Sequence, residues 1–81
     1  LYEYVDCYYS LNKLTDALKI LNTYDNSELS DNIIFLKSKI YFKLQSYTES
    51  LSDLEYLLNH HEYSDYHNII KFEIEKINLL K

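Results

Sequence analysis

The 81-residue chain contains no glycine and no proline. Sheet-rich folds use these residues at their tight turns, because glycine reaches backbone conformations closed to other residues and proline fixes the turn in advance. Helix interiors exclude both residues, since each of them weakens a helix. Their joint absence argues against a sheet-rich fold and predicts an all-α fold.

Cysteine occurs once, at Cys7, so the chain cannot form an internal disulfide. That pattern is typical of reducing compartments and predicts an intracellular protein, cytoplasmic or nuclear. No apolar run approaches the roughly 20 residues of a membrane span, and no signal-peptide pattern opens the chain. The chain begins at Leu1 and has no methionine, which indicates a piece of a longer protein. Because Glu3 and Asp6 disfavour a thiolate nearby, we expect Cys7 to be a buried or half-buried structural residue.

Basic residues are few, since 8 lysines stand against 13 acidic residues and give a formal net charge of −5. Nucleic acids and anionic membranes bind proteins largely through clustered Lys and Arg. We therefore expect neither a nucleic-acid partner nor a membrane partner. RNA contact through Lys37, Lys39 and Lys43 remains a minor alternative.

The sequence also lacks the patterns that carry catalysis or metal binding. There is no glycine-rich phosphate loop and no nucleophile with a nearby histidine base. The acidic segment 25–31 lacks the central glycine of a calcium loop and is interpreted as a solvated linker. His60, His61 and His67 lack zinc-ligand spacing, because adjacent residues on a helix do not face each other. We expect helix-end histidines, no metal, no cofactor and no enzyme activity.

What the chain does contain is apolar residues at helical spacing, which predict five amphipathic helices. The clearest stripes are Leu14, Leu18 and Leu21 in one helix, and Tyr47, Leu51, Leu54, Leu57 and Leu58 in another. The expected ranges are 1–11, 14–24, 32–44, 47–59 and 64–80. Ser46 and Glu49 form a capping-box pattern at the start of the fourth helix, and Ser64 or Asp65 can cap the fifth.

The last of these helices carries apolar residues on two sides, which is typical of a helix that packs on two neighbours. One side is expected to present Tyr66, Ile70, Ile74 and Ile77, and the other Ile69 and Phe72.

The sequence repeats itself when it is shifted so that Tyr8 lies on Tyr41, a period of 33 residues. A period of this length is typical of helical-repeat proteins. The identical pairs fall at helical spacing, and further positions match in kind. The identical pairs include Leu11 with Leu44, Thr15 with Thr48, Leu18 with Leu51, Leu21 with Leu54 and Asn26 with Asn59.

Within the second copy, Ser38 supplies a small residue in the first helix and Tyr41 an aromatic near its end. Tyr47, Ser50 and Leu54 supply an aromatic, a small and a large apolar residue in the second helix. In these positions the chain resembles the tetratricopeptide repeat. The first copy offers Tyr8, Leu14, Ala17 and Leu21. The chain departs from the family pattern at several positions. The turn glycine is replaced by Gln45 in the second copy and by Asn12 in the first, and the closing proline by Glu62 and Leu29. Larger residues take positions that are small in the family, namely Leu57 and Tyr24 in the second helices and Val5 in the first helix of the first copy.

The resemblance implies one tetratricopeptide-like domain over residues 1–81. Repeat 1 would cover about 1–30, repeat 2 about 31–62, and a capping or third-repeat helix about 64–80. It also implies that first-helix side chains line a concave, partner-binding face. That face would hold Tyr2, Asp6, Tyr9 and Ser10 from the first helix, and Phe35, Lys39, Phe42 and Lys43 from the third. Aromatic rings and two lysines suit a peptide with apolar anchors and an acidic group.

We therefore expect a protein–protein interaction scaffold that binds a peptide or helix of a partner. Tetratricopeptide subunits of larger assemblies, such as the anaphase-promoting complex or the signal recognition particle, are what the resemblance suggests. Two and a half repeats further predict neighbouring repeats or a homo-oligomer. The alternative is a purely structural helical bundle, or a dimerisation domain, whose tyrosines are internal and which has no peptide groove.

Overall fold

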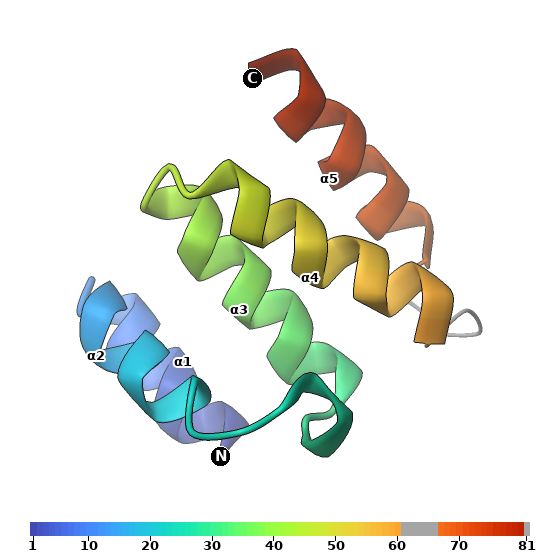
Figure 1. Ribbon diagram of the computed structural model, residues 1–81. Coiled ribbons are helices and arrows are strands. Elements are labelled where there is room, and N and C mark those ends of the chain that lie inside the picture. The colour runs from blue at the N-terminus through green and yellow to red at the C-terminus, as the bar shows by residue number, and fades with distance from the viewer. Residues whose placement is uncertain (61–66, 81) are drawn as a thin grey trace.

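The computed structural model describes residues 1–60 and 67–80 (Figure 1). Within these ranges every regular element is helical, which confirms the prediction of an all-α fold. The elements are α1 (Tyr2–Ser10), α2 (Leu14–Leu21), a short 3₁₀ helix η1 (Asn26–Glu28), α3 (Asp31–Lys43), α4 (Tyr47–His60) and α5 (His67–Leu80).

The helices pack mainly against their neighbours in sequence. α1 packs on α2, both contact α3, α3 packs on α4, and α4 packs on α5. Figure 1 shows the resulting order, with α3 between the α1–α2 pair and α4, and with α5 on the far side of α4. This order leaves α3 and α4 as the two central helices, because each has helices on both sides.

The core follows the apolar stripes predicted for α2 and α4. Leu14 and Leu21 of α2 are buried, as are Leu51, Leu54 and Leu57 of α4. The remaining predicted stripe residues are partly buried and pack against this core: Leu18, Tyr47 and Leu58. The period of 3.6 residues therefore identified the inward face of both helices.

A small buried residue lies at the same position of α2 and of α4, the second helices of the two sequence copies. A small side chain lets each of these helices pack closely on its neighbours. Ala17 in α2 and Ser50 in α4 are separated by the 33-residue period, and both are fully enclosed. The Ser50 hydroxyl donates a hydrogen bond to the carbonyl oxygen of Ser38 in α3, 2.8 Å away. This bond satisfies a buried hydroxyl and joins α3 to α4.

The turns α1–α2 and α3–α4 have the same backbone geometry, 33 residues apart. Asn12 and Gln45 have φ of 60° and 62°, the left-handed conformation in which glycine commonly ends a helix. In each turn the next N–H donates back to a carbonyl inside the helix, from Lys13 to Tyr8 at 2.8 Å and from Ser46 to Tyr41 at 2.9 Å. Asn12 and Gln45 thus occupy the positions where the sequence lacked the repeat's glycine.

Replacing Gln45 with glycine should therefore stabilise the fold. A glutamine in the left-handed region carries a steric cost of about 1 kcal/mol that glycine avoids. The more flexible unfolded chain of the variant offsets part of that gain. We expect Gln45→Gly to raise the free energy of unfolding by up to ~1 kcal/mol and Asn12→Gly by less, because asparagine tolerates this conformation. Urea unfolding followed by circular dichroism measures both, and destabilisation by Gln45→Gly would contradict the turn geometry.

Three local predictions need correction. α2 ends at Leu21 rather than Tyr24, because the Thr23 hydroxyl donates to the Ile20 carbonyl oxygen at 2.7 Å and closes a turn there. The Ser46 N–H, which the predicted capping box pairs with the Glu49 side chain, donates to the Tyr41 carbonyl oxygen at 2.9 Å instead. The linker 25–31 is not wholly irregular, since it holds η1, where Glu28 Oε1 accepts from the Asp25 N–H at 3.0 Å.

The start of the last helix is described only from His67 onward. Three residues of its predicted start lie outside the described residues: the possible caps Ser64 and Asp65, and Tyr66 of the apolar stripe. Ile70 and Ile77 are buried and Ile74 is partly buried, so this predicted apolar side of the helix packs against the core. None of the described helices combines the length and the apolar character that crossing a membrane requires.

Candidate functional site

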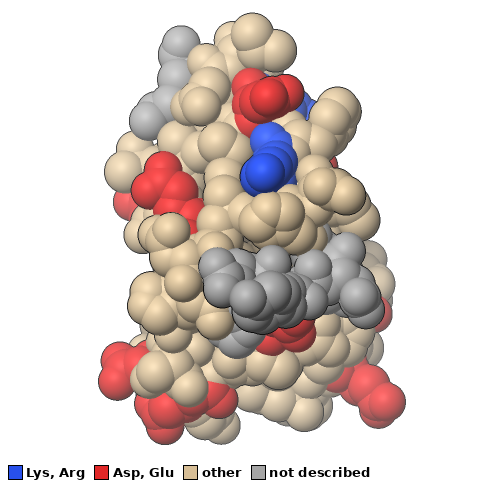
Figure 2. All heavy atoms as spheres, turned by 90° about the vertical axis from the view of Figure 1, so that its right-hand side faces the viewer, with Lys and Arg blue, Asp and Glu red and all other residues tan. Residues whose placement is uncertain are grey.

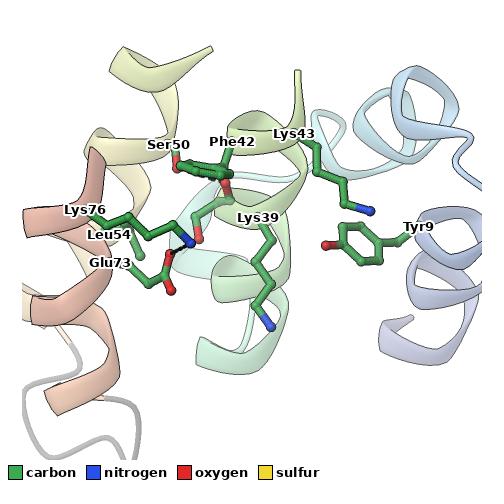
Figure 3. Close-up of a pocket in the computed structure, with 9 residues that line it drawn as sticks. Tyr9, Lys39, Phe42, Lys43, Ser50, Leu54, Glu73 and Lys76 are labelled. Atoms are coloured by element: carbon green, nitrogen blue, oxygen red, sulfur yellow. Dashed lines mark hydrogen bonds and ion pairs between the residues drawn. The ribbon is translucent and has the colours of Figure 1, made fainter. Parts of the chain in front are cut away.

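A groove of about 280 Å³ lies across α1, α3 and α5 (Figure 3). Its walls come from Tyr9 on α1, from three side chains of α3, and from two of α5. Its floor contains Ser38 and Leu54 together with Ser50. The α3 residues are Lys39, Phe42 and Lys43, and those of α5 are Glu73 and Lys76. The groove lies just below the ~300–1,000 Å³ typical of small-molecule pockets and suits side chains of a peptide.

Each lysine of the groove lies over an aromatic ring. Lys39 Nζ is 4.8 Å from the centre of the Phe35 ring, and Lys43 Nζ is 4.5 Å from that of Tyr9. Lys76 Nζ is 4.7 Å from the centre of the Phe42 ring. The second and third of these cation–π contacts link α3 to α1 and α5 to α3. They hold the ammonium groups in place while leaving their donor hydrogens open to an incoming acceptor.

The groove is positively charged although the chain is acidic overall. It contains three lysines and one glutamate, whereas the whole chain has a formal net charge of −5. Among the described residues, the ion pairs found join Lys76 to Glu73 at 3.6 Å and Lys37 to Asp53 at 3.5 Å. Lys39 and Lys43 belong to neither. Figure 2 shows the right-hand side of the Figure 1 view, where acidic side chains are scattered over the face and little basic surface is visible.

Four of the predicted partner-binding residues line this groove: Tyr9, Lys39, Phe42 and Lys43. The others do not. Tyr2 is exposed outside it, Asp6 is half-buried, and Ser10 is exposed beyond its edge. Phe35 is only 7% exposed and belongs to the hydrophobic core, where it also supports Lys39. Its replacement would therefore report on core packing rather than on binding.

Sequence reasoning missed the α5 wall of the groove. Glu73 and Lys76 were not predicted as site residues, although Lys76 lies 33 residues after Lys43 and so falls in the register of the earlier copies. Their i, i+3 spacing is the one local signal that places them on a common helix face. It becomes informative only once the packing of α5 on α4 is known.

A buried polar cluster joins the linker to α3 and α4. Lys37 is 8% exposed and Asp53 is 5% exposed, so neither side chain faces solvent. Lys37 Nζ donates to Asn26 Oδ1 at 2.8 Å, and Asn26 Nδ2 donates to Asp53 Oδ1 at 3.1 Å. The linker was predicted to be solvated, and Lys37 was a candidate for RNA contact. Lys37 is buried and so is not placed for RNA contact, and Asn26 of the otherwise largely exposed linker is half-buried by the cluster.

The Asp53 carboxyl is electrostatically unfavourable in its charged form. Burial raises its pKa above the ordinary value, and the Asn26 hydrogen bond and the Lys37 charge lower it only in part. Its second oxygen, Oδ2, is buried and has no hydrogen-bond partner in the part of the chain that the structure describes. An unpartnered buried oxygen favours protonation, so we expect the cluster to respond to pH.

The stability of the chain should therefore fall, relative to an Asp53→Asn variant, as pH rises. A carboxyl whose folded-state pKa is raised contributes stability that is complete below the unfolded pKa and is lost as pH rises through the folded pKa. The difference should therefore change over a pH range that begins near the ordinary carboxyl pKa of about 4 and extends upward from it. Urea unfolding of both proteins across that range measures it. A difference that stays constant, or that favours the wild type more at higher pH, would contradict the assigned direction.

The side chains that were considered as possible metal ligands do not come together in the described part of the chain. Among the residues that the structure describes, no group of three or more His, Cys, Asp or Glu side chains is placed to hold a metal ion. His60 ends α4, stacks on the Tyr56 ring at 4.1 Å and contacts the Tyr56 carbonyl oxygen, as a helix-end histidine does. His61 and Glu62 lie outside the described residues. Cys7 is exposed, contrary to prediction, because Val5 takes the core position of α1.

Comparison of the chain with protein-family models, curated proteins and solved structures returned no match. The functional assignment therefore depends on the geometry and the chemistry of the groove.

Proposed function

We propose that this chain is a protein-interaction module that binds a peptide segment of another protein in the groove formed by α1, α3 and α5. In this proposal α1–α2 and α3–α4 are two tetratricopeptide-like repeats and α5 begins a third or caps the array. The first helices of the three units then share one face. The observation that carries the proposal is that one groove collects side chains from all three of them.

Two features of the structure support a repeat arrangement. The helix pairs pack in sequence order, so that each unit contacts the next. The turns at Asn12 and Gln45 share one left-handed geometry at the 33-residue period. Repeats stacked in this way present a continuous inner surface that is suited to extended ligands.

The groove offers two kinds of recognition. Phe42 is partly buried and its ring meets Tyr47 edge-on, with ring centres 5.6 Å apart, which leaves an apolar surface fixed in position. Rigid aromatic surfaces of this kind anchor apolar side chains at interfaces. The lysines around it favour segments that also carry carboxylates, because electrostatic complementarity selects partners of opposite charge. The expected ligand is an acidic segment with apolar anchors.

The test is a selection of a random 12-residue peptide library on the immobilised chain. Each enriched peptide is measured again on a Lys39→Gln/Lys43→Gln variant. Both lysines are exposed, so these changes should leave the fold intact, as circular dichroism can verify. We expect about a tenfold loss of affinity, because two charge contacts are removed together. The matched control is Lys19→Gln/Lys71→Gln, whose lysines are exposed and do not line the groove.

The proposal fails if no enriched peptide distinguishes the groove variant from the control. A selection that yields only peptides bound equally by both variants would place recognition elsewhere on the surface.

A second candidate is a structural or dimerisation domain, and an exposed apolar surface on α5 favours it. Ile69, Phe72, Leu79 and Leu80 are between 48% and 87% exposed. Exposed apolar patches of this kind mark surfaces that contact other protein. Sedimentation of the wild type and of a Phe72→Asp variant separates the candidates. A dimer that Phe72→Asp dissociates supports self-association, and a monomer in both cases supports the groove.

A further inference from the structure

In the structure, the apolar anchor surface of the groove is covered by a lysine of α5. Lys76 Nζ lies 4.7 Å from the centre of the Phe42 ring and 3.6 Å from Glu73 Oε2 (Figure 3). An apolar side chain that packs on this ring must displace the lysine. The Phe42 ring is therefore covered by a lysine of the same chain before any partner binds.

We propose that Glu73 and Lys76 form a self-inhibitory gate that an acidic residue of the bound segment opens. This inference rests on the proposed function of the groove. The carboxylate of the bound segment replaces Glu73 as the partner of Lys76. An apolar neighbour in the same segment replaces Lys76 on the Phe42 ring. The groove would then select segments in which an acidic residue lies beside an apolar one.

The geometry of the pair suits an exchange of this kind. Lys76 and Glu73 are one helical turn apart, and their side chains are 46% and 23% exposed. Ion pairs at such exposure are weak and are readily exchanged for other partners in water. The lysine side chain can rotate away from Phe42 without any movement of α5, because only its own side-chain torsions need to change. The gate thus requires no change in the fold.

Lys76 differs from the other two lysines of the groove in this respect. Lys39 lies over Phe35, which is buried in the core and offers no anchor surface. Lys43 lies over Tyr9, and no ion pair involves it among the described residues. Lys76 alone combines a half-exposed anchor ring with an acidic neighbour that holds it in place. Glu73 is also the only carboxylate that lines the groove in the described part of the chain.

The test applies the same random 12-residue library to the wild type, to Lys76→Gln and to Glu73→Gln. Lys71→Gln serves as the control, because Lys71 is exposed on the same helix and does not line the groove. The readout is how often Asp or Glu lies next to an apolar residue in the peptides whose binding depends on Lys39 and Lys43. We expect enrichment of such pairs with the wild type and the control. With Lys76→Gln such pairs should occur only as often as the acidic and apolar content of the selected peptides gives by chance, because Lys39 and Lys43 still favour acidic residues.

Affinities give a second readout. The strongest groove-dependent peptide of the wild-type selection is compared with a twin in which Asn and Gln replace its Asp and Glu. Glu73→Gln should strengthen binding of the acidic peptide by about threefold to tenfold, the range that one exposed charge contact supplies, and should change the twin little. Lys76→Gln should weaken the acidic peptide and strengthen the twin, because it uncovers the ring and removes the charge.

The outcomes separate this inference from the proposed function. Groove-dependent peptides with the same acidic enrichment on the wild type and on Lys76→Gln would overturn the gate and leave the binding site standing. Weaker binding of the acidic peptide by Glu73→Gln would also overturn it. A library that yields no groove-dependent peptide would overturn both.

Discussion

Replacing Lys37 with methionine should lower the free energy of unfolding by about 3 kcal/mol at neutral pH, the size expected when one partner of a buried ion pair is removed. Lys37 supplies the positive charge of the buried cluster and pairs with Asp53 Oδ1 at 3.5 Å. Methionine fills a similar volume but leaves the Asp53 carboxylate enclosed without a cation. Asn26 remains as its hydrogen-bond donor. Urea unfolding followed by circular dichroism measures the loss.

The double variant Lys37→Met/Asp53→Leu separates the cost of an orphaned charge from the value of the pair. Replacing both members of a buried ion pair with apolar residues is often neutral or stabilising. We expect the double variant to recover to within about 1 kcal/mol of the wild type. A single variant as stable as the wild type would show that Asp53 is solvated, which its 5% exposure contradicts.

Replacing Leu54 with alanine should cost about 3 kcal/mol, because large-to-small changes in a core lose burial and leave a cavity. Leu54 is 1% exposed on α4, between α3 and α5, and it forms part of the groove floor. Leu21 is the matching residue of the first copy and is fully buried on α2. Leu21→Ala should therefore cost a similar amount. Stability for a chain of this length is about 4–12 kcal/mol, so either loss is a large fraction.

The control for both core variants is Leu79→Ala. Leu79 is 87% exposed on α5, and its replacement should change stability by less than ~0.5 kcal/mol. Equal effects of Leu54→Ala and Leu79→Ala would contradict the packing of α4 between its neighbours. A severe effect at Leu54 with none at Leu21 would contradict the equivalence of the two helix pairs.

Helix periodicity was sufficient to predict the five helices and most of the core. The stripes Leu14–Leu21 and Leu51–Leu58 point inward because their spacing matches 3.6 residues per turn. The end of α2 was not predictable from this pattern. It depends on the Thr23 hydroxyl, which competes for a helix carbonyl, and local side-chain competition of this kind leaves no periodic signal.

The part of the candidate site on α1 and α3 followed from the resemblance, and the part on α5 did not. Glu73 and Lys76 enter the groove because α5 packs on α4, which no local pattern specifies. The burial of Lys37 was missed for a related reason. Its partners Asn26 and Asp53 lie on η1 and α4, so the cluster exists only after tertiary folding. Phe35 was expected on the surface, but its helix carries buried residues on most of its circumference.

The central claim is that a peptide segment binds on the face shared by α1, α3 and α5. It is tested most directly by adding a peptide selected from the library to ¹⁵N-labelled protein and recording amide chemical shifts. We expect the largest changes around Tyr9, Lys39, Lys43 and Lys76. Changes concentrated instead around Lys19 and Thr48, which lie on α2 and α4 and do not line the groove, would contradict it.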